Sequence, residues 1–218
     1  DKPKTMSIRT HAELAVGTCA DNSDYIYLKD KEGLKQYHYR LGWEDPRYSY
    51  ENPVEGWMAH VDSKEKIALI RLFQPVDEDI KVLFWRGHNE GGPVRDKKGG
   101  FYALDRFMNN KPVEPGETIN ATEEFYIIQG LSRVDFVNGY MAGAVELDKL
   151  IYGPGQEVNT TVFIGGAKKD GPYKVTISTD LAIIDSKNLP AHQPGQTRSV
   201  KFKFHSQGDT DLKVSVLN

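Results

Sequence analysis

The chain has 218 residues, of which 39% are apolar and 27% are charged. Its 31 acidic and 28 basic residues give a formal net charge of -3 and are interspersed, which argues against a nucleic-acid-binding protein, because such a protein carries a basic stripe. No apolar run approaches the roughly 18 residues that a membrane-spanning helix requires, so no membrane span is expected.

The first half of the chain contains short β-prone runs separated by turn residues. The run 25–28 is followed by a polar turn that ends in Gly33, and the next run interleaves tyrosines with His38. Short runs at regular spacing, with turn chemistry between them, predict an all-β sandwich. The strands expected in this half are residues 25–28, 34–41, 58–61, 67–73, 81–85, 101–108 and 118–129.

Residues 42–56 interrupt this pattern with a loop that has neither helical nor strand periodicity. The loop holds Trp43, Tyr48 and Tyr50 together with two prolines and several carboxylates. An ordered loop of this composition favours a functional role. Aromatic rings in a long loop equally serve to fix it to the core, and both interpretations stay open.

Two stretches, residues 57–62 and residues 84–90, each combine a tryptophan, a histidine and a carboxylate. A pyranose ring presents a flat apolar face that stacks on an aromatic ring, and its hydroxyls bond to carboxylates, amides and arginine. All three tryptophans of the chain lie within its first 85 residues, although core packing is the alternative role of each. The candidate ligand-binding residues are Trp43, Trp57, Trp85, Arg86, Asn89 and Asp62.

A family resemblance is carried by residues 113–119, which contain a Pro-Gly-Glu turn, and by residues 123–130, which contain a Phe-Tyr pair. Together with the His-Val-Asp sequence in residues 57–71, they resemble galactose-mutarotase-like supersandwich domains over about residues 25–145. The resemblance implies a sugar site in which a His and a Glu on a concave sheet act as acid and base. The catalytic residues it implies are His60, His88 and Glu90.

The sequence changes in character near residue 150. Apolar and polar residues alternate clearly in residues 200–204 and 212–216, which is typical of strands with one solvated face. In size and strand spacing, residues 150–218 resemble an immunoglobulin or fibronectin type III module, although they contain neither Cys nor Trp. We therefore expect a supersandwich-like β domain at residues 1–149 and an immunoglobulin-like β-sandwich at residues 150–218. The strands expected there are residues 158–164, 173–178, 181–184, 200–204 and 212–216.

The histidines do not by themselves predict a metal site. His60 with Asp62, and His88 with Glu90, are each two residues apart, so both members of a pair share one face of a strand. A zinc site needs more ligands than one pair supplies, and the solvated face of a sandwich also accounts for such pairs. No metal and no cofactor are predicted. The basic pair at residues 168–169, beside glycines, is typical of a solvated loop tip.

Cys19 is the single cysteine, which excludes an intramolecular disulfide. The start at residues 1–4 is typical of a processed or truncated chain, and sequon matches at residues 120–122 and 159–161 favour export. The sequence thus predicts a carbohydrate-binding β-sandwich protein of an exported or cell-surface system, with a saccharide as its partner. Two alternatives stay open: a carbohydrate-active enzyme of epimerase, lyase or hydrolase type, and a structural or adhesive surface module. No oligomeric state is indicated.

Overall fold

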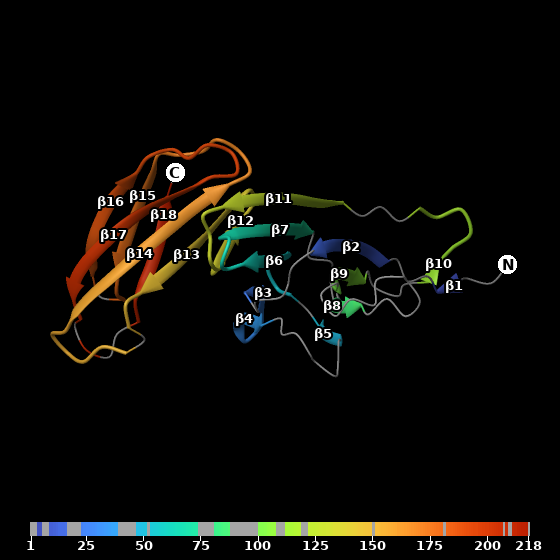
Figure 1. The fold of residues 1–218 in the computed structure, drawn as a ribbon, viewed down its shortest axis with the longest axis horizontal. Helices are drawn as coiled ribbons and strands as arrows, with labels where there is room; N and C mark the ends of the chain where they lie inside the picture. Colours follow the sequence, from blue (N-terminus) through green and yellow to red (C-terminus); the bar gives the residue numbers. More distant parts are fainter. Residues whose placement is uncertain are drawn as a thin grey trace. The chain divides into compact units, whose positions relative to one another are not determined.

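All regular elements that the structure describes are β-strands, which confirms the predicted all-β class (Figure 1). Within these residues there is no helix that is long and apolar enough to cross a membrane. The computed structural model describes residues 4–5, 9–16, 23–38, 47–51, 53–73, 81–87, 100–107, 112–118, 122–149, 151–180, 182–206, 208 and 211–217.

The chain divides into two compact units. Unit 1 comprises Asp1–His60 and Arg71–Phe125, and unit 2 comprises Val61–Ile70 and Tyr126–Asn218. The domain boundary expected near residue 150 falls within unit 2, between two strands that pair with each other. That boundary stays a prediction, and the two units are described separately below.

Unit 1 contains a four-stranded antiparallel sheet in the order β2-β9-β8-β5. Strand β8 lies between β9 and β5, so that Trp85 of β8 pairs with Ala103 on one side and with Arg47 on the other. A separate two-stranded sheet joins β1 to β10. The bounds are Lys4–Thr5 for β1, Arg9–Val16 for β2, Arg47–Glu51 for β5, Lys81–Gly87 for β8, Gly100–Phe107 for β9 and Pro112–Val113 for β10.

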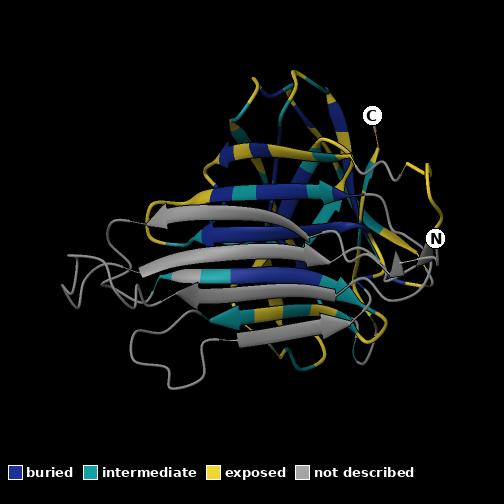
Figure 2. Ribbon diagram, turned by 90° about the vertical axis from the view of Figure 1, so that its right-hand side faces the viewer, coloured by how far each residue is buried: buried dark blue, intermediate teal, exposed yellow. Residues whose placement is uncertain are grey.

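A five-stranded sheet has the order β11-β7-β6-β3-β4. Its central strand β6 is buried continuously from Trp57 to Val61, as expected for an apolar run that is covered on both faces. In Figure 2 buried residues, in dark blue, follow the strands, and exposed residues concentrate in turns and at edges. The bounds are Asp24–Asp30 for β3, Gly33–His38 for β4, Trp57–Asp62 for β6, Ile67–Phe73 for β7 and Glu123–Gln129 for β11.

The remaining strands of unit 2 form two sheets, with the orders β12-β13-β14-β17 and β16-β15-β18. Strand β14 is paired on both sides, with β13 and with β17, and its neighbours lie beside it in Figure 1. The bounds are Phe136–Asn138 for β12, Met141–Leu147 for β13, Glu157–Gly166 for β14, Tyr173–Ser178 for β15, Ile183–Leu189 for β16, Thr197–His205 for β17 and Lys213–Leu217 for β18.

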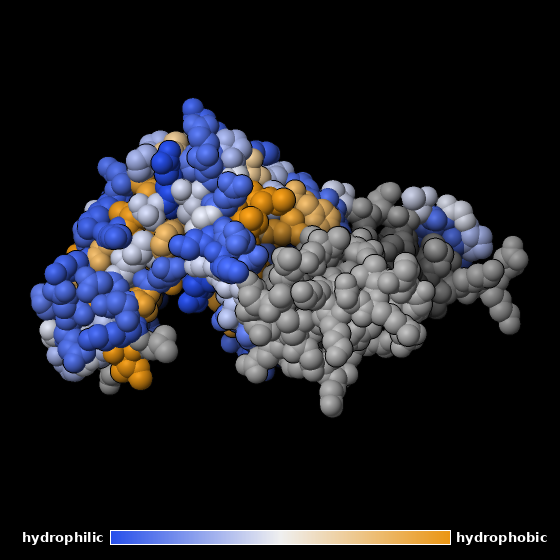
Figure 3. Space-filling view, in the orientation of Figure 1, coloured by the Kyte–Doolittle hydropathy of each residue, from blue (hydrophilic) through white to orange (hydrophobic). Residues whose placement is uncertain are grey.

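One apolar core joins these two sheets into a β-sandwich. On β17, Phe202 and Phe204 are buried while Lys201 and Lys203 are exposed, so the alternation expected for this strand is confirmed. The side of the sandwich in view in Figure 3 is mostly hydrophilic. The buried core residues are Val158, Val162, Ile164, Tyr173, Val175, Ile177, Leu189, Phe202 and Phe204.

Candidate functional site

Trp57, a predicted sugar-stacking residue, is only 1% exposed. Its indole Nε1 donates a 3.0 Å hydrogen bond to Oε2 of Glu55, and Lys29 donates to the other oxygen of that carboxylate. Burial raises the pKa of Glu55, but the hydrogen bonds from Lys29 and Trp57 outweigh it, and the net shift of this pKa is downward. Trp57 thus lies in the core, which is the alternative role that the sequence left open for each tryptophan.

His60 and Asp62 both lie on β6. His60 is 8% exposed, which leaves little of its ring accessible to a substrate. Oδ1 of Asp62 accepts hydrogen bonds from the backbone N–H groups of Lys64 and Glu65, each at 3.0 Å. Asp62 therefore holds the turn between β6 and β7.

Of the other predicted site residues, the structure describes only two. Trp85 and Arg86 lie on β8, and Trp43, His88, Asn89 and Glu90 lie outside the described residues. The part of the chain that the structure describes contains no group of three or more His, Cys, Asp or Glu that could hold a metal ion. The predicted catalytic and binding roles in the first half stay predictions.

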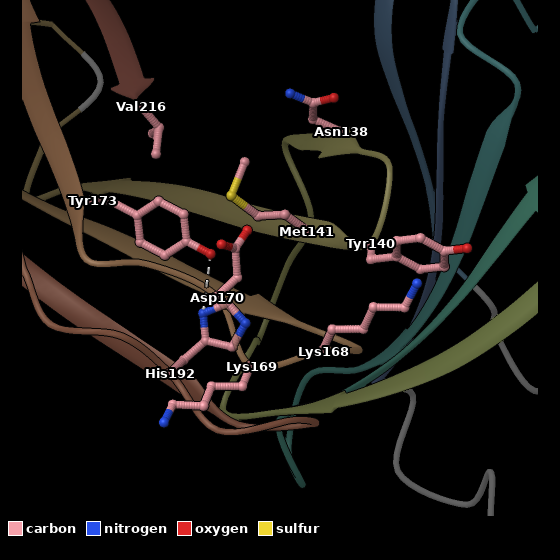
Figure 4. A pocket seen from close by; sticks show the side chains of 9 residues that line it. All are labelled: Asn138, Tyr140, Met141, Lys168, Lys169, Asp170, Tyr173, His192 and Val216. Atoms are coloured by element: carbon pink, nitrogen blue, oxygen red, sulfur yellow. Dashed lines mark hydrogen bonds between the residues drawn. The ribbon is translucent and has the colours of Figure 1, made fainter. Parts of the chain in front are cut away.

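A pocket of about 420 Å³ opens on unit 2, at the end of the sandwich where β14 and β16 finish and β15 and β17 begin (Figure 4). Loop and strand residues that are distant in sequence meet there because antiparallel strands return to the same end. The pocket is lined by Asn138, Tyr140, Met141, Lys168, Lys169, Asp170, Tyr173, His192 and Val216.

Tyr140 forms one side of the pocket, at the tip of the β12–β13 hairpin. Asn138 pairs with Met141, and Gly139 between them has a φ of +56°, which the tight turn requires. The hydroxyl of Tyr126 donates a 3.0 Å hydrogen bond to the carbonyl of Gly139 and thereby supports the turn. Tyr140 as a residue is 39% exposed. The hairpin thus presents an aromatic ring at the pocket.

Tyr173 and His192 form the inner wall. Their rings stack at a centroid distance of 5.8 Å and an angle of 12°, and the Tyr173 hydroxyl lies 3.3 Å from Nδ1 of His192. His192 is held by its backbone N–H, which donates to the carbonyl of Asp170 at 3.1 Å. Burial raises the pKa of Tyr173 well above its usual value, and the charge of the Asp170 carboxylate raises this pKa further.

The second ring nitrogen of His192 faces the backbone. His192 is 1% exposed, and its Nε2 has no hydrogen-bond partner among the described residues. A Cβ atom on Gly166 would lie 2.8 Å from this Nε2, so the absence of a side chain at Gly166 makes room for the ring.

Two lysines complete the pocket from the loop after β14. Nζ of Lys168 lies 3.4 Å from the centroid of the Tyr140 ring, a cation–π contact, while Lys169 extends in another direction in Figure 4. Neither lysine forms an ion pair with any described residue. Oδ1 of Asp170, in contrast, accepts a 2.8 Å hydrogen bond from the N–H of Gly171.

Comparisons with protein-family models, with curated proteins and with solved structures found no match to this chain. The resemblances to mutarotase-like and immunoglobulin-like domains therefore stay predictions.

Most residues of the unit 2 pocket were not singled out from the sequence. The basic pair at residues 168–169 is exposed, as expected for a solvated loop tip, and it also lines the pocket. A usable signal was the sequence 165–171, where glycines flank three consecutive charged residues between two strands.

Proposed function

We propose that this chain is a carbohydrate-binding β-sandwich protein of an exported or cell-surface system, and that the unit 2 pocket is its binding site. The observation that carries the proposal is the combination of an exposed aromatic ring, Tyr140, with hydrogen-bonding side chains around one open pocket. Sugars need both components, because their ring faces are apolar and their hydroxyls are polar.

The size and chemistry of the pocket support a small saccharide. Its volume of about 420 Å³ lies within the range of roughly 300–1,000 Å³ that is usual for small-molecule sites. Asn138 supplies both a donor and an acceptor, and Lys169, which also lines the pocket, supplies donors. Tyr140 is positioned by a supported hairpin turn, so little order has to be gained on binding.

Glycan-array binding followed by isothermal titration calorimetry tests this proposal. We expect saccharide binding by the intact chain and a loss of at least about tenfold in affinity for Tyr140→Ala, since stacking and area burial are both lost. The matched control is Ile151→Ala, because Ile151 is an 86% exposed apolar residue that does not line the pocket. This control should bind like the unaltered chain.

Two results would contradict the proposal in different ways. An array without any binding would reject carbohydrate recognition and favour the structural or adhesive alternative. Binding that survives Tyr140→Ala but is lost in Trp85→Ala would retain carbohydrate recognition and move the site to the residues predicted in the first half of the chain.

A further inference from the structure

Resting on the proposed function, we propose that the unit 2 pocket selects saccharides that carry an anionic substituent, and that Lys168 is the residue that recognises this group. The first support is the charge of the lining. Lys168, Lys169 and Asp170 line the pocket, so two positive charges face one negative charge. This local excess is opposite in sign to the net charge of -3 of the whole chain.

The one negative charge of the lining, the Asp170 carboxylate, already interacts with neighbouring groups of the protein. The Asp170 carboxylate accepts a hydrogen bond from Gly171 N–H at 2.8 Å and lies against the buried Tyr173 hydroxyl, whose pKa it raises. Lys168 and Lys169 are exposed and have no carboxylate partner in the described part of the chain. The two ammonium groups are therefore available to a ligand, whereas the Asp170 carboxylate is occupied by contacts within the protein.

The position of Lys168 disfavours neutral sugars, in addition to the attraction of its charge for anionic ones. Its Nζ lies over the Tyr140 ring at 3.4 Å from the centroid, which is a face that a sugar ring would use. A neutral sugar that stacks there must displace the ammonium group and lose the cation–π contact. An anionic sugar displaces it too, but its carboxylate or sulfate then pairs with the displaced ammonium. The lost cation–π contact is therefore compensated for anionic sugars and left uncompensated for neutral ones.

Lys169 should contribute less. Its side chain extends away from Tyr140 in Figure 4, so its charge adds to the positive electrostatic potential at the pocket, but its ammonium does not cover the face of the Tyr140 ring. Solvent and salt screen such a contribution strongly. The two neighbouring lysines thus provide an internal comparison between direct recognition and a general positive field.

Calorimetry on the full chain with matched ligands tests this inference. The probes are methyl glucoside, methyl glucuronide and glucose 6-sulfate, with inorganic sulfate as the free anion. We expect the two anionic sugars to bind at least about tenfold more tightly than the neutral one, as a charge-assisted hydrogen bond implies. The preference should decrease as salt is raised from about 20 mM to about 500 mM.

Variants separate the roles of the lysines. Lys168→Gln should abolish the preference and leave the affinity for methyl glucoside equal or higher, because the Tyr140 ring face is then unoccupied. Lys169→Gln should reduce the preference only in part, and Lys174→Gln, an exposed lysine outside the pocket, should not change it. All three lysines are exposed, so an unchanged melting temperature verifies that each variant is folded.

The outcomes distinguish this inference from the proposed function. Equal affinities for neutral and anionic sugars, or a preference that survives Lys168→Gln, would overturn the inference and leave carbohydrate binding intact. Inorganic sulfate that binds as tightly as the anionic sugars would overturn it as well, because the site would then recognise a bare anion. Absence of binding by every sugar would reject the proposed function itself.

Discussion

Replacement of Gly166 by alanine tests whether the hairpin and His192 pack as described. The added Cβ would lie 2.6 Å from the carbonyl oxygen of Tyr140 and 2.8 Å from Nε2 of His192. The oxygen has little freedom to move, because it accepts a 2.9 Å hydrogen bond from Ala167 N–H. The carbonyl of Gly166 is fixed in the same way by a 2.7 Å bond from Gly195 N–H. A shift of the His192 ring would relieve the contact with Nε2, whereas the contact with the carbonyl oxygen is relieved only by a local distortion of the backbone.

The expected loss follows from overpacking in a constrained site. One inserted methyl group of this kind destabilises by roughly 1–3 kcal/mol, and the backbone contact places Gly166→Ala near the middle, at about 2 kcal/mol. For a protein of this size each kcal/mol lowers the melting temperature by about 2–4 °C, so we expect a decrease of roughly 4–8 °C. Displacement of His192 should also weaken binding at the pocket.

Thermal unfolding by circular dichroism measures the stability, and the imidazole signals of His192 in NMR spectra report the displacement of its ring. Gly153→Ala is the control, because the nearest atom to its added Cβ is a flexible Gln156 side-chain atom at 3.6 Å. The control should melt within about 1 °C of the unaltered chain. A decrease of less than about 2 °C for Gly166→Ala, with unchanged His192 signals, would refute the described packing.

Two further predictions concern unit 1. Arg71 is fully buried, and its Nη2 lies 2.7 Å from Oε2 of Glu123, so Arg71→Met should cost about 3–5 kcal/mol in urea unfolding by leaving the carboxylate without this partner. The double variant Arg71→Met/Glu123→Leu should regain most of that loss, and a double variant as unstable as the single one would contradict this account. The pKa of Glu55 is shifted below its ordinary value of 4.5, so its ionised form contributes stability that is present above that pH and is lost as the pH falls through the lowered pKa. Glu55→Gln should accordingly lower the melting temperature at neutral pH, and at acidic pH it should melt at the same temperature as the unaltered chain. An equal difference in melting temperature at the two pH values would show that the charge of Glu55 does not contribute to stability.

Two strands have the bounds that the sequence predicts. The expected strands at residues 67–73 and 173–178 coincide with Ile67–Phe73 and Tyr173–Ser178. Strand β13, Met141–Leu147, was not predicted, because its alanines and glycine have low β propensity and its partner β14 supplies the pairing. Tertiary pairing thus created a strand that local composition does not indicate.

The candidate site was harder to predict, for two physical reasons. Residue type does not reveal whether a side chain on a strand faces a ligand or the core, so the sequence left both roles open for Trp57, which the structure places in the core. The pocket residues Tyr140, Lys168 and His192 lie on three separate connections. They meet only through strand pairing and the backbone bond between His192 and Asp170, neither of which is a local sequence signal.

The dipeptide at residues 168–169 sits between two anchored neighbours. Ala167 is tied to the hairpin through Tyr140, and Asp170 is tied to His192. Its two exposed side chains can therefore be exchanged without disturbing either anchor. Variants that differ only at these two positions would share one fold and present different side chains at the pocket. The dipeptide is therefore a suitable position for changing the ligand specificity of the sandwich.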